Sequence, residues 1–208
     1  QVPAFQAFLE EGVFSDFAAF MAIKESHGWH ALSTWQEKYR IRDKEALNAF
    51  LAANEDEVLF WQFTQYEFFR QWGELKSYAN ARGIEIMGDM PLYVSEDSVE
   101  VWAHPELFLL NGDGTPTEVA GVPPDYFSKD GQLWGNPLYN WEKMRQDGYA
   151  WWTARLQKAL SMYDIVRIDH FRGFDRFYAI PTGSKNARVG CWRDGPKEAL
   201  FEGKKDWK

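Results

Sequence analysis

The sequence predicts an α/β fold in which short parallel strands alternate with helices, as in a βα barrel or a doubly wound sheet. Two short apolar runs, one before Asp89 and one at 165–168, each end in an aspartate, and the β-branched residues of the second run predict a buried strand. A helical segment and a glycine precede the first run, and a helical segment at 147–162 precedes the second. This order completes a strand–loop–helix–strand crossover, which joins parallel strands.

Composition limits the classes of partner. The 208 residues are 45% hydrophobic and 17% aromatic, which is enough for one sizeable core and leaves no segment that looks disordered. The formal net charge of −8 argues against a nucleic-acid partner, because such proteins carry a basic surface. The 11 tryptophans fit a carbohydrate ligand, whose apolar faces stack on aromatic rings, although aromatic residues more often fill cores.

Metal, disulfide and membrane signals are missing from the sequence. Cys191 is the single cysteine, and the four histidines show no metal-ligand spacing, so we expect no metal site. No apolar run is long enough to span a bilayer and no signal peptide opens the chain, so we expect a soluble protein of a reducing compartment. Because no initiator methionine is present, we also expect sequence upstream to be missing.

The first half of the chain predicts helices. Apolar residues at helical spacing indicate short helices within 1–35, a helix capped by Asp43, and one long helix over 54–82 that ends at Gly83. The aromatic stripe of the long helix predicts core packing rather than a sugar platform.

Residues 95–140 show little regular pattern apart from a tight turn at 111–114. So long an irregular stretch is usually functional, which favours a binding loop or lid; the alternative is a surface excursion packed by its own aromatic residues. A further short extended run follows at 174–181, and the tail from Thr182 shows no closing element.

The polar end of the second strand carries the main candidate site. Arg167 and Asp169 lie two residues apart and therefore point to the same side of a strand, where the guanidinium favours the ionised carboxylate. In an α/β barrel this position faces the catalytic mouth, and Asp89 would converge on the same mouth. An ionised carboxylate there suits a nucleophile or an oxocarbenium stabiliser, while the alternative is a structural ion pair that caps the strand.

Four motifs together resemble the 4-α-glucanotransferases of glycoside hydrolase family 77, the amylomaltases or disproportionating enzymes, which are relatives of the α-amylases. They are Gly-Asp-Met-Pro at 88–91, Gly-Val-Pro-Pro-Asp-Tyr-Phe at 121–127, Gly-Gln-Leu-Trp-Gly-Asn-Pro-Leu-Tyr at 131–139 and Arg-Ile-Asp-His-Phe-Arg-Gly at 167–173. The resemblance covers most of the chain, and the second and third motifs are the most particular to this family.

The resemblance implies part of a (β/α)8 TIM barrel with long inserted loops on the catalytic face. Its implied substrates are maltooligosaccharides and other α-1,4-glucans, and it implies no cofactor, no metal, no nucleic acid and no membrane. Family members hold a donor glucan as a covalent ester and pass it to the 4-hydroxyl of an acceptor sugar. The implied location is the cytoplasm, or the plastid in a photosynthetic eukaryote.

The resemblance also assigns roles residue by residue. It implies that Asp169 is the nucleophile, with Arg167 beside it and Asp89 supporting the donor-side sugar. His170 would flank the acceptor side. The remaining implied contacts are Asp125, Tyr126 and Phe127 in a loop over the acceptor subsites, and Trp134 and Asn136 near the cleavage point.

One departure from the family pattern is plain. The family's acid/base glutamate and its third carboxylate have no matching motif before Lys208, and Glu198 and Glu202 do not stand at a strand end. A complete barrel needs about 250 residues. We therefore expect residues 1–208 to be the central segment of one glucanotransferase barrel, active in the parent enzyme but not alone.

Two alternatives differ in their consequences. An α-amylase-type hydrolase would raise the number of reducing ends, whereas transfer conserves it. A non-catalytic glucan-binding protein would use the aromatic loop without chemistry, so Asp169→Asn would leave its function intact.

Overall fold

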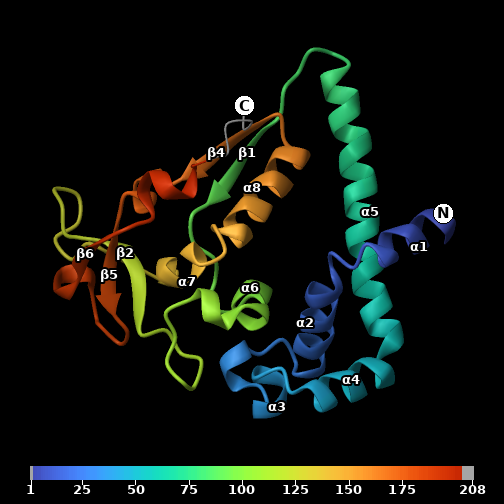
Figure 1. Cartoon of the computed structure of the whole chain (residues 1–208), viewed down its shortest axis with the longest axis horizontal. Helices are drawn as coiled ribbons and strands as arrows, with labels where there is room; N and C mark the ends of the chain where they lie inside the picture. Colours follow the sequence, from blue (N-terminus) through green and yellow to red (C-terminus); the bar gives the residue numbers. More distant parts are fainter. Residues whose placement is uncertain (1, 203–208) are drawn as a thin grey trace. The chain divides into compact units, whose positions relative to one another are not determined.

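The computed structural model describes residues 2–202 and divides the chain into two compact units. Unit 1 comprises Gln1–Ile86 and Asp97–Ala103; unit 2 comprises Met87–Glu96 and His104–Lys208. Figure 1 gives the element labels used below. No helix within residues 2–202 is both long and apolar enough to cross a membrane.

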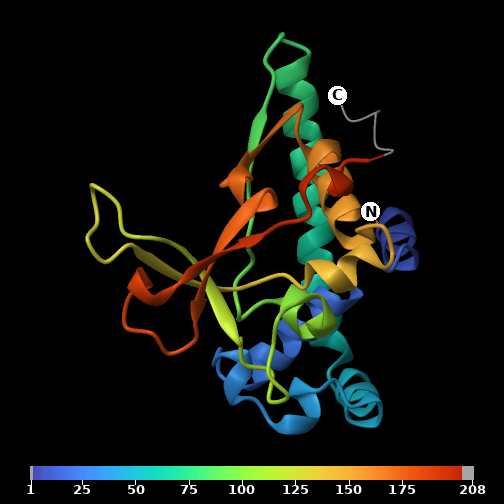
Figure 2. The ribbon, with the colours of Figure 1, turned by 60° about the vertical axis from the view of Figure 1, so that its left-hand side comes forward.

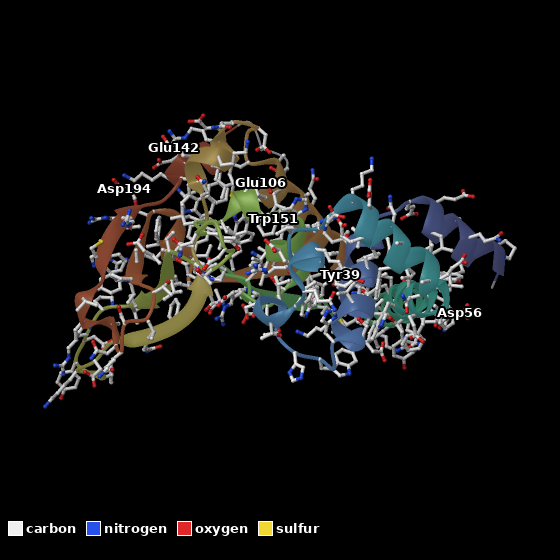
Figure 3. The ribbon with its side chains drawn as sticks, turned by 90° about the horizontal axis from the view of Figure 1, so that it is seen from below. Tyr39, Asp56, Glu106, Glu142, Trp151 and Asp194 are labelled. Atoms are coloured by element: carbon white, nitrogen blue, oxygen red, sulfur yellow. The ribbon has the colours of Figure 1, made fainter. Side chains whose placement is uncertain are left out.

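Unit 1 is built of helices. They are α1 (Val2–Glu10), α2 (Ser15–Ser26), α3 (Glu37–Arg40), α4 (Lys44–Ala53), α5 (Glu55–Asn80) and α6 (Val99–Ala103), with a 3₁₀ turn at Leu32–Thr34. Their core gathers Phe20, Ile23, Trp35 and Trp102. The segment 97–103 belongs here because Asp97 binds the ammonium of Lys24 and the Trp102 indole donates to the Tyr39 carbonyl at 2.8 Å. Tyr39 is labelled in Figure 3.

The caps predicted from the sequence are confirmed. The Asp43 carboxylate accepts from the Ala46 amide at 2.9 Å at the start of α4. Gly83 has φ +72°, and the amide beyond it donates to the Ala79 carbonyl, which closes α5 in a Schellman-type turn.

The prediction that the aromatic stripe of α5 forms core is confirmed only in part. Tyr66 is buried, and four further residues of the stripe are half-buried: Val58, Trp61, Phe69 and Trp72. The other four are 40% or more exposed: Leu59, Phe63, Leu75 and Tyr78. The neighbours α1, α2 and α4 cover only part of the surface of so long a helix.

Unit 2 begins with a parallel pair of strands, β1 (Met87–Pro91) and β4 (Ile165–Asp169), joined through α7 (Trp141–Arg145) and α8 (Ala150–Met162). The predicted parallel pairing and crossover are confirmed, and β1 and β4 lie side by side next to α8 (Figure 1). The register places Asp89 opposite Arg167 and Pro91 opposite Asp169.

The prediction that the 165–168 strand is buried is wrong, because one face of this pair is open in the described chain. Gly88 and Met90 are buried on the side where α8 packs, and a Cβ on Gly88 would lie 2.2 Å from the Tyr163 ring. On the opposite face, Met87 and Ile165 are 61% and 41% exposed. Side chains alternate along a strand, so a two-stranded sheet covered by helix on one side exposes every second residue.

A second sheet follows. Two of its strands lie within residues 95–140, so the prediction that this stretch has little regular structure is wrong for them. The sheet is antiparallel, in the order β3-β2-β5-β6, with β2 (Glu118–Val122), β3 (Gln132–Pro137), β5 (Arg176–Pro181) and β6 (Cys191–Asp194). The tight turn at 111–114 and the extended run at 174–181 are confirmed, whereas the tail beyond Thr182 does contain a further strand, β6. Val119, Tyr178 and Ile180 form its buried cluster, which explains why the strands pair.

Candidate active site

Three charged side chains meet on one face of β1 and β4: Asp89 and Arg167 in the middle of their strands and Asp169 at the carboxyl end of β4. Arg167 lies between two aspartates: its Nε is 3.3 Å from Oδ1 of Asp89, and its Nη2 donates to Oδ1 of Asp169 at 2.9 Å. All three side chains are on the open face and are about three fifths exposed, at 58%, 58% and 62%. The two aspartates therefore converge as predicted, but Asp89 is the middle residue of β1 and not its end, because the strand begins at Met87 and continues to Pro91.

The register explains this cluster. Asp89 and Arg167 are direct partners across the parallel pair, and Asp169 follows Arg167 by one full strand repeat. One guanidinium thereby orients two carboxylates at the edge of the sheet where ligands of α/β proteins bind. Such a cluster can present one carboxylate oxygen as a nucleophile while the cation offsets the repulsion between the two aspartates.

His170 follows Asp169 directly and has a left-handed backbone, with φ 54° and ψ 40°. A non-glycine residue in this region is strained by about 1–3 kcal/mol, and such strain occurs often at functional sites. Burial lowers the pKa of His170; the negative charge of Asp169 raises it and the positive charge of Arg172 lowers it further. Its Nε2 is buried without a hydrogen-bond partner in the structure.

The ring of His170 belongs to an aromatic group. The Trp134 ring lies edge-on to it, with centroids 4.9 Å apart, and the Tyr93 ring is 6.3 Å from both. Burial, followed by the neighbouring Tyr139, raises the pKa of Tyr93 well above its ordinary range. Asn136 donates through Nδ2 to the Val94 carbonyl at 2.8 Å, which ties β3 to the segment after β1.

The loop 123–131 projects from the second sheet (Figure 2) and carries two almost fully exposed rings. Tyr126 is 97% and Phe127 93% exposed. Oδ1 of Asp125 accepts from the amides of Phe127 and Ser128, at 2.9 and 2.8 Å, so this carboxylate holds the turn that presents the rings. Arg188 fixes the base of the loop, since its Nε donates to the Lys129 carbonyl at 3.1 Å.

The structure thus groups the predicted residues in three places within unit 2. Asp89, Arg167 and Asp169 form one cluster; His170, Trp134 and Asn136 lie beside the segment after β1; the residues 125–127 stand on the projecting loop. Sequence analysis did not single out Tyr93, although it lies only four residues beyond Asp89 and a polar-capped strand end is a usual place for ligand contacts.

Glu142 and Asp194, both labelled in Figure 3, are exposed, and Asp194 pairs with Arg176 and Lys197. Within residues 2–202, no group of three or more His, Cys, Asp or Glu side chains could hold a metal ion.

Comparisons with known proteins identify the family of the chain. The family model Glyco_hydro_77, described as 4-alpha-glucanotransferase, matches residues 1–206. A 4-alpha-glucanotransferase of Thermus thermophilus is 51% identical over 201 residues, covering 96% of this chain and 40% of the relative. A chloroplastic/amyloplastic 4-alpha-glucanotransferase of Solanum tuberosum is 45% identical over 187 residues, covering 90% of this chain and 32% of the relative.

Solved structures give the same result. An amylomaltase from Streptococcus agalactiae in complex with acarbose matches with a TM-score of 0.92 and 48% identity, covering 96% of this chain and 41% of that one. An amylomaltase from Corynebacterium glutamicum, 21% identical over 96% of this chain and 26% of that one, shares the fold with a TM-score of 0.69. The chain spans about two fifths of the length of its Thermus relative. Because the family model matches almost the whole sequence, the chain belongs to the family of 4-alpha-glucanotransferases, Glyco_hydro_77.

Proposed function

We propose that residues 1–208 are the central segment of the catalytic (β/α)8 barrel of a 4-α-glucanotransferase, in which Asp169 is the nucleophile. The observation that carries this proposal is the bridge of Arg167 between Asp89 and Asp169 on one face of two adjacent parallel strands, with Asp169 at the carboxyl end of β4. In TIM barrels, catalytic residues stand at this end of the strands, and alternate residues fill the barrel interior.

The open face of β1 and β4 fits this placement. Met87 and Ile165 form an apolar layer one strand repeat before Asp89 and Arg167, on the same face. An interior layer of apolar side chains below a polar mouth is the arrangement that a barrel requires. The other face of the pair is covered by α8, as helices cover the outside of such a barrel.

The proposed reaction is a retaining double displacement. The Asp169 carboxylate attacks the anomeric carbon of the donor glucan, and the bond to the leaving sugar breaks. A carboxylic acid, which we place outside residues 1–208, protonates the leaving oxygen. The 4-hydroxyl of an acceptor glucan or glucose then attacks the glycosyl–aspartate ester and gives its proton to the same carboxylate.

The other residues have supporting roles in this proposal. Arg167 keeps Asp169 oriented, and Asp89 binds a hydroxyl of the donor-side sugar. His170, Trp134 and Asn136 line the cleavage point, where His170 is neutral near pH 7 because burial lowers its pKa. The loop with Asp125, Tyr126 and Phe127 covers the acceptor, which favours a sugar over water as the group that attacks the ester.

Maltooligosaccharides are the substrates that we propose, since one neighbour was solved with acarbose and the relatives are named for glucan transfer. We place the enzyme in the cytoplasm, or in the plastid if the source is a photosynthetic eukaryote, as the name of the Solanum relative indicates for that protein.

The test is maltotriose turnover by the full-length enzyme that contains this chain, compared with its Asp169→Asn variant. We expect glucose and longer maltooligosaccharides without a gain in reducing ends, and a loss of more than about 10³-fold in the variant, because the nucleophile is gone. Asp194→Asn is the matched control, since it alters an exposed ion-paired carboxylate of the same unit. A rise in reducing ends would favour the hydrolase, and absence of turnover by the unaltered enzyme would favour the binding protein. Unchanged turnover in Asp169→Asn would show that Asp169 is not the nucleophile.

A further inference from the structure

Arg155, on α8, binds the backbone at the point where β1 ends. Its Nη2 donates to the Pro91 carbonyl at 2.7 Å and its Nη1 donates to the Leu92 carbonyl at 3.0 Å. Its guanidinium also lies 4.8 Å from the centre of the Trp152 ring. Neither the motifs nor the reaction assigned any role to this residue.

A buried tyrosine completes the arrangement. Tyr139, only 1% exposed, donates its hydroxyl hydrogen to the Leu92 carbonyl at 2.7 Å. The hydroxyl oxygen of Tyr139 in turn accepts from Nη1 of Arg155 at 3.1 Å. Arg155 and Tyr139 therefore share one acceptor. Hydrogen bonds that a charged donor makes in a half-buried network are among the stronger ones.

Pro91 is the last residue of β1 and lacks a backbone donor. Proline has no amide hydrogen, so at this position β1 cannot donate to the neighbouring strand, where Asp169 is its register partner. The carbonyls of Pro91 and Leu92 are instead held by the guanidinium. The planar fork of arginine can serve several acceptors at once, whereas the ammonium of lysine is a single point charge.

The residues on both sides of this anchor belong to the candidate site. Asp89, two residues before Pro91, contacts Arg167, and Tyr93, directly after Leu92, lies 6.3 Å from the His170 ring. The Tyr93 ring also stacks on Tyr139, at 6.0 Å between centroids and 19° between planes. A shift of this backbone would therefore move both groups.

We propose that Arg155 is a positioning residue of the transfer reaction: acting from α8, it fixes the Pro91–Leu92 backbone so that Asp89 and Tyr93 face the Asp169 site. This inference rests on the proposed function. Arg155 itself contacts no reacting atom and acts through the end of β1.

The test uses the full-length enzyme that contains this chain, with Arg155→Met, Arg155→Lys and Tyr139→Phe. Kinetics with maltotriose are combined with hydrogen–deuterium exchange of the peptide that includes 91–94. Arg70→Met is the control, because among residues 2–202 the ion-pair partners of Arg70 are Glu67 and Glu74 of its own helix, at 2.8 and 2.7 Å. Melting temperatures show whether each variant is folded at the assay temperature.

We expect Arg155→Met to lower kcat about 10- to 100-fold with little change in KM, as misplacement of site residues by about 1 Å does. Exchange at 91–94 should become faster. Tyr139→Phe, which keeps the ring, should show a smaller loss in the same direction, and Arg155→Lys should recover only part of kcat. Arg70→Met should match the unaltered enzyme.

Three results would overturn the inference: unaltered kcat in Arg155→Met, full recovery by Arg155→Lys, or a loss of kcat that only follows the folded fraction while exchange at 91–94 stays the same. If the unaltered enzyme shows no transfer at all, the proposed function itself is wrong. If it transfers normally and Arg155→Met does too, only the role of Arg155 is wrong.

Discussion

Replacing Arg167 by methionine separates a catalytic from a structural role of the charged cluster. Methionine keeps much of the length of the arginine stem but removes the contacts to Asp89 and Asp169, at 3.3 and 2.9 Å. A structural ion pair and a catalytic one look alike in sequence, and their difference lies in what the contact contributes to stability.

The exposure of the three side chains determines how much stability the protein should lose in Arg167→Met. Each of the three side chains is about three fifths exposed in the described chain, and we place them at the mouth of the barrel, where water enters. Ion pairs in such exposed positions contribute about 0.2–1 kcal/mol each. Breaking a buried pair would instead cost about 3–5 kcal/mol. We therefore expect Arg167→Met to lower the free energy of unfolding by about 1 kcal/mol, while transfer falls about 100-fold or more because Asp169 loses its orientation.

The assay measures denaturant unfolding and maltotriose disproportionation on the same preparation of the full-length enzyme. Arg176→Met is the matched control, since Arg176 pairs with the exposed Asp194 at 3.7 Å and lies on the other sheet of the same unit. It should change neither quantity noticeably. A loss of about 3 kcal/mol or more in Arg167→Met, or full retention of transfer, would refute the reasoning and favour the structural interpretation.

Three further predictions concern the surroundings of the cluster. Gly88→Ala should lower the free energy of unfolding by about 1–3 kcal/mol, because the new Cβ would lie 2.2 Å from the Tyr163 ring. Gly73→Ala is the control: Gly73 lies within helix α5 with nothing within 4 Å of the new Cβ, so this change should raise the free energy of unfolding by about 0.5–1 kcal/mol. The free energy of unfolding should fall as the pH falls through about 6.5. Because the pKa of His170 is lowered in the folded chain, its imidazole takes up a proton in the unfolded chain at a pH where it is still neutral in the folded chain. Unfolding measured at several pH values should show a weaker pH dependence in His170→Gln. Asp125→Ala should raise hydrolysis relative to transfer, measured as reducing ends, since its two amide contacts are lost, and Asp125→Asn, which keeps the acceptor oxygen, should resemble the unaltered enzyme.

Local patterns predicted the parts of the fold that depend on neighbouring residues. The cap at Asp43, the end of α5 at Gly83 and the shared side of Arg167 and Asp169 each follow from spacing of a few residues, and each is found. The parallel pairing also followed, because a helix between two short apolar runs leaves few other topologies.

The antiparallel sheet was not predicted because its strands lack a period of two. β2 reads Glu-Val-Ala-Gly-Val and is buried at three successive positions, 119–121, so it shows no alternation. Its partner β5 lies about 60 residues further along the chain, and a single short segment carries no sign of that pairing.

Long-range hydrogen bonds explain what was missed at the site. The contact between Arg155 and Leu92 joins residues 63 apart, and the one between Asn136 and Val94 joins residues 42 apart. Asp125 was expected to contact a ligand because of its motif, whereas the structure shows its carboxylate bound to the loop backbone. A carboxylate in a turn can serve either purpose, and only the geometry of the nearby amides distinguishes them.

The pleat of one strand pair connects fold and chemistry in this chain. Along β1, Gly88 and Met90 face the helix side, where the close contact of Gly88 with Tyr163 permits no larger residue, and this fixes which residues face the other way. A shift of one residue in register would turn Asp89 toward α8 and bury its charge. Packing on the helix side of β1 therefore keeps Asp89 on the opposite face, where its carboxylate pairs with Arg167. α8 supplies the anchor at Pro91 through Arg155, and Tyr163, the residue directly after α8, supplies the constraint at Gly88, so substitutions at these positions should alter transfer without any contact with the glucan.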